Sequence, residues 1–143
     1  MTESRPPADG WRPLDIKGLW EHLGPMLARR EDGAWRYGLQ TDARHANPLG
    51  LVHGGTLMAL LDHTATIVAY HLLDRQTAVT VEQDTRFMAP ARAGDFLVAD
   101  ARLRQRSGSL LFLDSRICIE GKTVADASLI MKLIKPERVT GTR

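Results

Sequence analysis

Hydrophobic residues along this chain form one long continuous apolar segment and several shorter alternating ones. Residues 55–73 contain no Lys, Arg or Glu, and their apolar side chains recur at helical spacing while also covering much of the remaining circumference. A helix that is apolar on nearly all sides is a buried helix. The segment therefore predicts a central helix of about 19 residues, ~28 Å long at 1.5 Å per residue.

Alternating apolar and polar positions elsewhere predict strands. Five segments show this pattern: residues 34–39, 78–88, 96–106, 110–119 and 123–134. In the second of these, four side chains share one parity: Val79, Val81, Thr85 and Phe87. Short turns between the last four segments imply an antiparallel meander. The pattern thus predicts an α+β fold in which strands wrap around one long helix.

The N-terminal part of the chain carries weaker signals. Residues 1–13 are polar and rich in Pro, which predicts a flexible segment. Residues 14–27 approximate helical spacing, with a break at Gly24-Pro25, and Glu31-Asp32-Gly33 is typical of a turn. No repeat or linker marks a second domain, so residues 14–143 are expected to form one domain.

Composition narrows the classes of function. The net charge of +2, from 19 basic and 17 acidic residues, is too small to argue for nucleic-acid binding. The single cysteine, Cys118, excludes a disulfide framework within the chain and a metal site built on thiolates. No hydrophobic signal region opens the sequence, and the longest aliphatic run, Leu57–Leu61, is far shorter than a membrane span. We expect a soluble, cytoplasmic protein that does not bind membranes.

Asp62 is the only acidic residue between Ala43 and Leu73, and an isolated acid on an apolar helix is costly to bury without a partner or a task. Gly54 and Gly55 stand at the start of the same helix, where free N–H groups and the helix dipole favour a developing negative charge. Asp62 lies ~10.5 Å along the helix axis from Gly55. A carboxylate at that distance meets the mouth of a helix most readily when two helices pack in opposite directions, which points to a symmetric dimer.

The residues before and within this helix form the pattern H-x-N-x-x-G-x-x-H-G-G-x-x-x-x-L-x-D, from His45 to Asp62. A second segment, Thr80–Gly94, has a hydroxyl early in a strand, an aromatic-x-x-Pro ending and a Gly after the turn. Together they resemble the hotdog-fold acyl-CoA thioesterases of the phenylacetate-degradation (PaaI-like) type. The resemblance implies a hotdog fold, with a five- to six-stranded antiparallel sheet around one helix. It also implies a homodimer or a dimer of dimers, and no metal or redox cofactor.

The resemblance gives candidate catalytic roles to several residues. Asp62 would act as general base on water, or as a nucleophile that forms a transient anhydride, and the sequence leaves both open. Gly54 and Gly55 would supply the oxyanion hole. Asn47 could orient water or only shape a turn, and His53 could donate toward the carbonyl or brace its loop. Thr80 would hold Asp62 or water through its hydroxyl, or serve only as a β-former.

Other residues are candidates for binding an acyl- or aryl-CoA substrate, of which coenzyme A is a part. Leu57, Met58 and Leu61 would line an acyl slot between helix and sheet. Arg86 or Arg92 could bind the phosphates of coenzyme A, although arginines here also fit the solvated outer face of a strand. His45 is expected to hold its loop rather than to take part in chemistry.

Three alternatives remain open at this stage. A hydratase or dehydratase on the same fold would use a His and an acid at a different spacing. A non-catalytic acyl-CoA sensor would bind without turnover, although the retained Asp62 argues against it. Hydrolysis of acyl groups on a carrier protein is not excluded by the residues.

Overall fold

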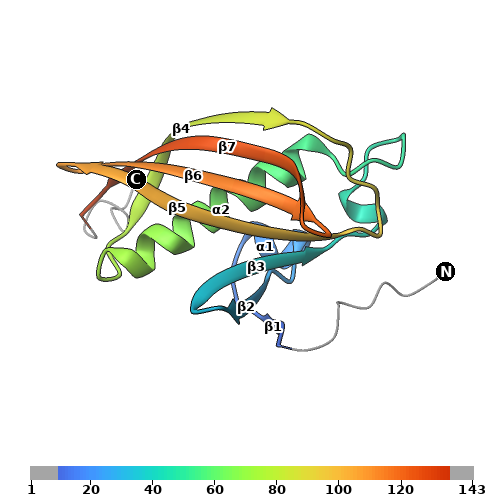
Figure 1. The fold of residues 1–143 in the computed structure, drawn as a ribbon, viewed down its shortest axis with the longest axis horizontal. Coiled ribbons are helices and arrows are strands. Elements are labelled where there is room, and N and C mark those ends of the chain that lie inside the picture. The colour runs from blue at the N-terminus through green and yellow to red at the C-terminus, as the bar shows by residue number, and fades with distance from the viewer. Residues whose placement is uncertain (1–9, 136–143) are drawn as a thin grey trace.

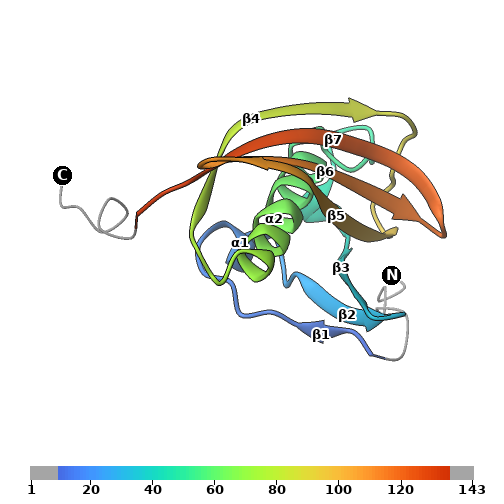
Figure 2. The same ribbon diagram turned by 60° about the vertical axis from the view of Figure 1, so that its left-hand side comes forward.

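In the computed structural model, which describes residues 10–135, a seven-stranded antiparallel sheet curls around one long helix (Figures 1 and 2). The helices are α1 (Leu19–Leu23) and α2 (Gly54–Leu72), with a 3-10 turn at Ala43–His45. The strands are β1 (Arg12–Pro13), β2 (Leu27–Glu31), β3 (Ala34–Gln40), β4 (Ala78–Phe87), β5 (Phe96–Ser107), β6 (Leu110–Ile119) and β7 (Lys122–Leu133). This confirms the predicted α+β arrangement.

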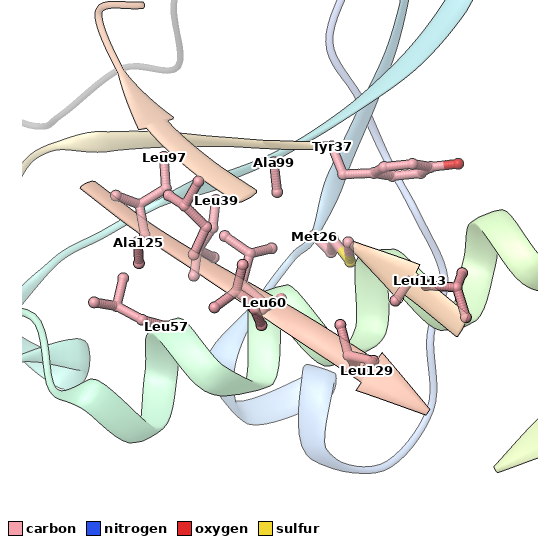
Figure 3. Packing of buried hydrophobic residues seen from close by; sticks show 14 of the residues in the cluster. Met26, Tyr37, Leu39, Leu57, Leu60, Leu97, Ala99, Leu113, Ala125 and Leu129 are labelled. Carbon is pink, nitrogen blue, oxygen red and sulfur yellow. The ribbon is translucent and has the colours of Figure 1, made fainter. Parts of the chain in front are cut away.

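The core lies between one side of α2 and the concave face of the sheet. Leu60, Leu61 and Ala65 of α2 are fully buried against residues of β5, β6 and β7. Figure 3 shows Leu57 and Leu60 packed among side chains of the sheet. Each leucine buried in this way contributes about 1.5–3 kcal/mol of transfer free energy, so this stripe fixes α2 against the strands.

The opposite side of α2 is left uncovered by residues 10–135. Met58, Tyr70 and Leu72 are 39%, 40% and 58% exposed. Figure 2 shows the sheet as an open curl, with β4 at one end, β1 and β2 at the other, and α2 inside. The prediction of a helix buried on all sides therefore holds only for its sheet-facing half within a single chain.

The strand order is β1-β2-β3-β5-β6-β7-β4. β5, β6 and β7 form the predicted meander, whereas β4 pairs with β7 and is an edge strand rather than a neighbour of β5. Helix α2 connects β3 to β4 across the concave face, which is why these consecutive strands lie far apart in the sheet.

The parity predicted for β4 is interrupted by a bulge. Thr80 pairs with Met131 and Glu82 pairs with Ile130, which leaves Val81 without a partner on β7. A bulge inserts one extra residue and reverses the alternation beyond it. Thr85 and Phe87 therefore face α2, but Val79 and Val81 do not share that face.

The N-terminal prediction was wrong in part. Gly18, at φ 81°, precedes α1, and Pro25 follows it, so the helix predicted over 14–27 spans only Leu19–Leu23. Residues Leu27–Glu31 instead form β2, joined to β3 by Asp32-Gly33, both of which have positive φ. Asp-Gly between two strands is a strong hairpin signal, and it was the available clue to β2. The sheet consequently has seven strands rather than five or six.

The segment predicted to be flexible, residues 1–13, falls largely on residues 1–9, which lie outside the described part of the chain. Residues 12 and 13 pair with β2 as β1. Among the described residues, no helix has both the length and the apolar character needed to cross a membrane.

Candidate active site

The mouth of α2 presents one backbone donor that the protein itself does not use. His53 is the N-cap of the helix, and its Nδ1 accepts the N–H of Gly55 at 2.8 Å. The N–H groups of Thr56 and Leu57 both donate to the His53 carbonyl. Among the described residues no acceptor takes the Gly54 N–H. Of the two glycines predicted to form an oxyanion hole, Gly54 is thus the one with a free donor.

The same contact assigns a role to His53. Since Nδ1 accepts a hydrogen bond, the neutral ring carries its proton on Nε2. The ring therefore caps the helix with one nitrogen and keeps an N–H donor on the other. Both roles considered for His53, bracing the backbone and donating to a substrate, are compatible with this geometry.

Phe87 covers the Gly54 position. A Cβ built on Gly54 would lie 3.3 Å from the Phe87 ring, which is closer than an ordinary contact. Phe87 is still 53% exposed in the single chain. Sequence reasoning did not select Phe87 as a site residue, although it supplies the aromatic position of the aromatic-x-x-Pro segment ending at Pro90.

Asp62 and Thr80 meet on the β4 side of α2. Asp62 is half-buried, and its Oδ1 accepts a hydrogen bond from the Thr80 hydroxyl. Within residues 10–135, Oδ2 has no hydrogen-bond partner. The carboxylate is therefore held by one oxygen and presents the other, which is the arrangement a general base or nucleophile needs. Burial lowers the pKa of the neighbouring His63, partly opposed by Asp62, so this ring favours its neutral form.

A second contact fixes β4 against α2 one turn earlier. The Gln83 amide donates to the Met58 carbonyl at 3.2 Å and to the Thr85 hydroxyl at 3.0 Å. Because of the bulge at Val81, Thr80 and Gln83 both face the helix although they are three residues apart. Gln83 was also missed by sequence reasoning, since a bulge leaves no periodic signal.

The loop before α2 is anchored by His45, as predicted. His45 is 1% exposed, its Nδ1 accepts the Asp42 N–H at 2.9 Å, and its Nε2 lies 2.6 Å from the Leu23 carbonyl. The side-chain hydrogen bond from Arg44 lowers the pKa of Asp42, which keeps its carboxylate charged at the start of this turn. The His53 N–H in turn donates to the His45 carbonyl at 2.7 Å, which ties the loop to the helix mouth.

Asn47 shapes the tip of this loop with its carbonyl oxygen. Its Oδ1 accepts the N–H groups of Leu49 at 2.9 Å and Leu51 at 3.2 Å. This assigns the orientation of the amide, because an NH₂ group could not accept them. The NH₂ group has no acceptor among the described residues and remains available as a donor.

The remaining predicted residues do not all gather at this site. Leu57 and Leu61 lie in the core, at 4% and 0% exposure, and only Met58 reaches the surface. Arg86 lies on the outer face of the sheet, paired with Asp126 at 2.7 Å, on the side away from Asp62. Arg92 follows β4, is bridged to Leu51 through its backbone and is exposed, so it lies beside the loop.

The two candidate groups, the Gly54 N–H and the Asp62 carboxylate, therefore lie on one helix but far apart. Gly54 and Asp62 are eight residues, or ~12 Å, apart along α2. A thioester carbonyl oxygen held by the Gly54 N–H lies too far from the Asp62 carboxylate of the same chain for one group to serve the other. No cluster of three or more His, Cys, Asp or Glu side chains in residues 10–135 is arranged to hold a metal ion.

Comparison with known proteins gives a consistent picture. Residues 49–125, which include α2, β4 and the loop tip, match the model of a family described as the thioesterase superfamily. Acyl-coenzyme A thioesterase 13 of Mus musculus is 27% identical over 74 residues, which make up 52% of this chain and 53% of that protein. The chain thus spans about half the length of the curated relatives it matches.

Two solved structures are similar over more of the chain. A Ralstonia eutropha JMP134 protein, described as related to phenylacetic acid degradation, is 29% identical, with a TM-score of 0.71. The similarity covers 84% of this chain and 92% of that one. A Bacillus halodurans protein solved with CoA is 27% identical with a TM-score of 0.71, over 76% of this chain and 73% of that one.

Proposed function

Because this chain belongs to the thioesterase superfamily, and has the hotdog fold, we propose that it hydrolyses acyl-CoA thioesters to a free acid and coenzyme A. The observation that carries the proposal is the pair of unused groups described above: the free Gly54 N–H at a helix mouth and the free Oδ2 of Asp62. The CoA bound in the Bacillus halodurans relative supports the choice of a CoA thioester.

In the proposed reaction, water adds to the thioester carbonyl carbon while Asp62 takes its proton. The negative charge that forms on the carbonyl oxygen is stabilised by the Gly54 N–H, aided by the positive end of the helix dipole. The tetrahedral intermediate collapses, the carbon–sulfur bond breaks, and the proton passes to the coenzyme A thiolate. Asp62 could instead attack the carbonyl and form an anhydride that water then hydrolyses, and a carboxylate held by one oxygen serves either route.

Asn47, His53 and Thr80 have supporting roles in this proposal. The Thr80 hydroxyl holds the carboxylate in one orientation. The Asn47 NH₂ and the His53 Nε2–H are donors near the helix mouth that can orient water or the thioester carbonyl. Arg92, exposed beside the same loop, is placed better than Arg86 to reach a phosphate of coenzyme A.

The site is proposed to form between two copies of the chain. β4 is an edge strand with exposed Val79 and Val81, and an unpaired apolar edge invites pairing with another strand. Two copies joined along β4 by a two-fold axis would extend the sheet and set their α2 helices in opposite directions. Asp62 of one copy would then approach Gly54 of the other, and a dimer of dimers could be built from this unit.

The test is release of free thiol from a panel of acyl- and aryl-CoAs by the purified protein, beside the Asp62→Asn variant. Asn keeps the shape and the bond to Thr80 but cannot take a proton. We expect a loss of about 10²–10⁴-fold in kcat with an unchanged circular dichroism spectrum. Full activity of the variant would overturn the assignment of Asp62. Tight binding of acyl-CoA by the wild type without any thiol release would overturn hydrolysis itself.

A further inference from the structure

A groove runs along the flank of α2 that faces β2 and β3, beyond Asp62 in the chain. Its larger part has a volume of about 400 Å³ and lies between α2 and the sheet; we call it the α2 groove. It is lined by Leu14, Asp15, Ile16, Ala28, Trp35, Tyr37, Ile67, Tyr70 and His71. Its walls are mainly apolar and aromatic, which is typical of small-molecule sites.

The α2 groove adjoins a second hollow that lies closer to Asp62 along α2. A second hollow of about 270 Å³ shares Ile67 and Tyr70 with it and is also lined by Thr66, Thr77 and Ala78. Thr66 lies one helical turn beyond Asp62, and its hydroxyl donates to the Asp62 carbonyl at 2.9 Å. Residues Thr77 and Ala78 lead directly into the segment that carries Thr80. The hollow therefore lies about one helical turn beyond Asp62, on the β4 side of α2.

Tyr37 supplies an unpaired polar group in the α2 groove. Its side chain faces α2 from β3 and is only 3% exposed, yet its hydroxyl has no hydrogen-bond partner in the described part of the chain. Figure 3 shows the hydroxyl oxygen pointing away from the labelled leucines of the core. Burial raises the pKa of this phenol, so it remains a neutral donor and acceptor. The hydroxyl belongs to a residue that lines the α2 groove, so an oxygen of a bound ligand can form a hydrogen bond with it.

Resting on the proposed thioesterase activity, we infer that the α2 groove binds the acyl group and that the Tyr37 hydroxyl selects acyl chains ending in a neutral hydrogen-bonding oxygen, such as a terminal hydroxyl. An apolar groove accepts the chain itself, and the phenol pairs with the oxygen at its end. A terminal carboxylate is disfavoured, because burying a charge against a neutral phenol leaves most of its hydration uncompensated.

The position of the α2 groove sets the length of chain that fits. Ile67 and His71, which flank Tyr37, lie five and nine residues beyond Asp62, or ~7.5–13.5 Å along α2. The acyl chain must therefore be of medium length to bring its terminal oxygen to Tyr37. Shorter chains stop in the smaller hollow beside Thr66.

The experiment measures kcat/KM for a ladder of straight-chain acyl-CoAs from six to twelve carbons, each with and without a terminal hydroxyl. In the wild type we expect the hydroxyl to raise kcat/KM about three- to tenfold at one intermediate length, the range of a single hydrogen bond. In Tyr37→Phe we expect the ratio of kcat/KM with the terminal hydroxyl to kcat/KM without it to fall to about one at every length, whatever the variant does to the plain series. Tyr70→Phe removes the other tyrosine hydroxyl of the same groove and is the matched control, which should keep the advantage.

The experiment distinguishes a folding defect from a change in substrate preference. Phe keeps the volume of Tyr37 and breaks no internal hydrogen bond, so the melting temperature should not fall. If the wild type hydrolyses the plain series but gains nothing from the terminal hydroxyl at any length, the inference is wrong and the proposed function stands. An equal advantage in wild type and Tyr37→Phe would likewise overturn the role of Tyr37. If no member of either series is hydrolysed, the proposed function fails first.

Discussion

At the residue scale, the proposed stabilisation of the transition state depends on the Gly54 N–H. The other donors of the first helical turn are taken by His53, through its ring for Gly55 and through its carbonyl for Thr56 and Leu57. Within residues 10–135, the Gly54 N–H is the one left without an acceptor, on a residue beside which the Phe87 ring lies. Partial burial beneath an aromatic ring lowers the local dielectric constant and strengthens a hydrogen bond to a developing oxyanion.

Comparing Gly54→Pro with Gly54→Ala distinguishes the effect of losing the N–H donor from the effect of filling the space beside it. Pro is well tolerated at the first position of a helix, where its missing N–H has no partner in the helix. His53, at φ −59° and ψ 136°, already has the extended conformation required before Pro. Gly54→Pro should lower kcat by about 10²–10³-fold, the cost of one oxyanion donor.

Gly54→Ala is the control, because it adds a similar Cβ against Phe87 but keeps the N–H. We expect it to lose much less activity than Gly54→Pro, with both variants compared by single-turnover thiol release and thermal unfolding. Equal losses in the two variants would mean that space, and not the donor, matters at this position.

At the residue scale, the sequence predicted which residues form the motif, but few of the contacts that they make. The Thr80 hydroxyl donates to Asp62, which is one of the roles that the resemblance left open for it. Phe87, Gln83 and Tyr37 were missed, since their importance comes from what lies against them in space. The anchoring role of His45 was predicted, but the use of Gly55 by the His53 ring could not be read from spacing alone.

At the scale of elements, α2 and β4 are held together by two side-chain hydrogen bonds on either side of the β4 bulge. Thr80 reaches Asp62, and Gln83 reaches the Met58 carbonyl. The two contacts have different consequences. The Thr80 contact orients the carboxylate whose other oxygen is proposed to react. The Gln83 contact satisfies a backbone carbonyl that takes no part in the proposed reaction.

Thr80→Val and Gln83→Met should therefore affect different measurements. Val has the shape of Thr without the hydroxyl, so Asp62 loses its one fixed contact, and we expect kcat to fall about tenfold, the value of a hydrogen bond to a charged group. Thr80→Ser should restore most of it. Gln83→Met should leave kcat near the wild-type value but lower the free energy of unfolding by about 1 kcal/mol, a few degrees in melting temperature. If Gln83→Met reduced kcat as strongly as Thr80→Val, the division of roles would be wrong.

Elements with a long uniform pattern were predicted well. Segment 55–73 and the last four strands lie within a residue or two of their predicted bounds. The errors lie where local signals competed. Helical spacing extends over 14–27, but Gly18 and Pro25 limit the helix to Leu19–Leu23. The turn at Asp32-Gly33 pairs the residues after Pro25 with β3, so they form β2. The bulge at Val81 could not be predicted, because only the pairing with β7 reveals the extra residue.

At the scale of the whole molecule, the uncovered side of α2 and the free edge of β4 lie at the same opening of the curled sheet (Figure 2). Met58, Val81 and Phe87 are exposed there, while the sheet-facing side of α2 is fully buried. Long apolar side chains on an open sheet edge favour association with a second copy. Gly54 and Asp62 of one chain lie ~12 Å apart along α2. In the proposed mechanism, association of two copies is therefore what brings the two groups together.

Hybrid dimers test this shared site directly. Asp62→Asn and Gly54→Pro, each nearly inactive alone, are co-expressed with different tags, and the hybrid is isolated through both tags. If Asp62 of one copy serves Gly54 of the other, one of the two sites in a hybrid carries both substitutions and the other carries neither. The hybrid should then recover about half of the wild-type activity per dimer, as two-fold symmetry requires. A site built within a single chain would carry one defect in every copy, so the hybrid would stay as inactive as its parents. A protein that remains monomeric would not be recovered through both tags, which would also overturn the shared site.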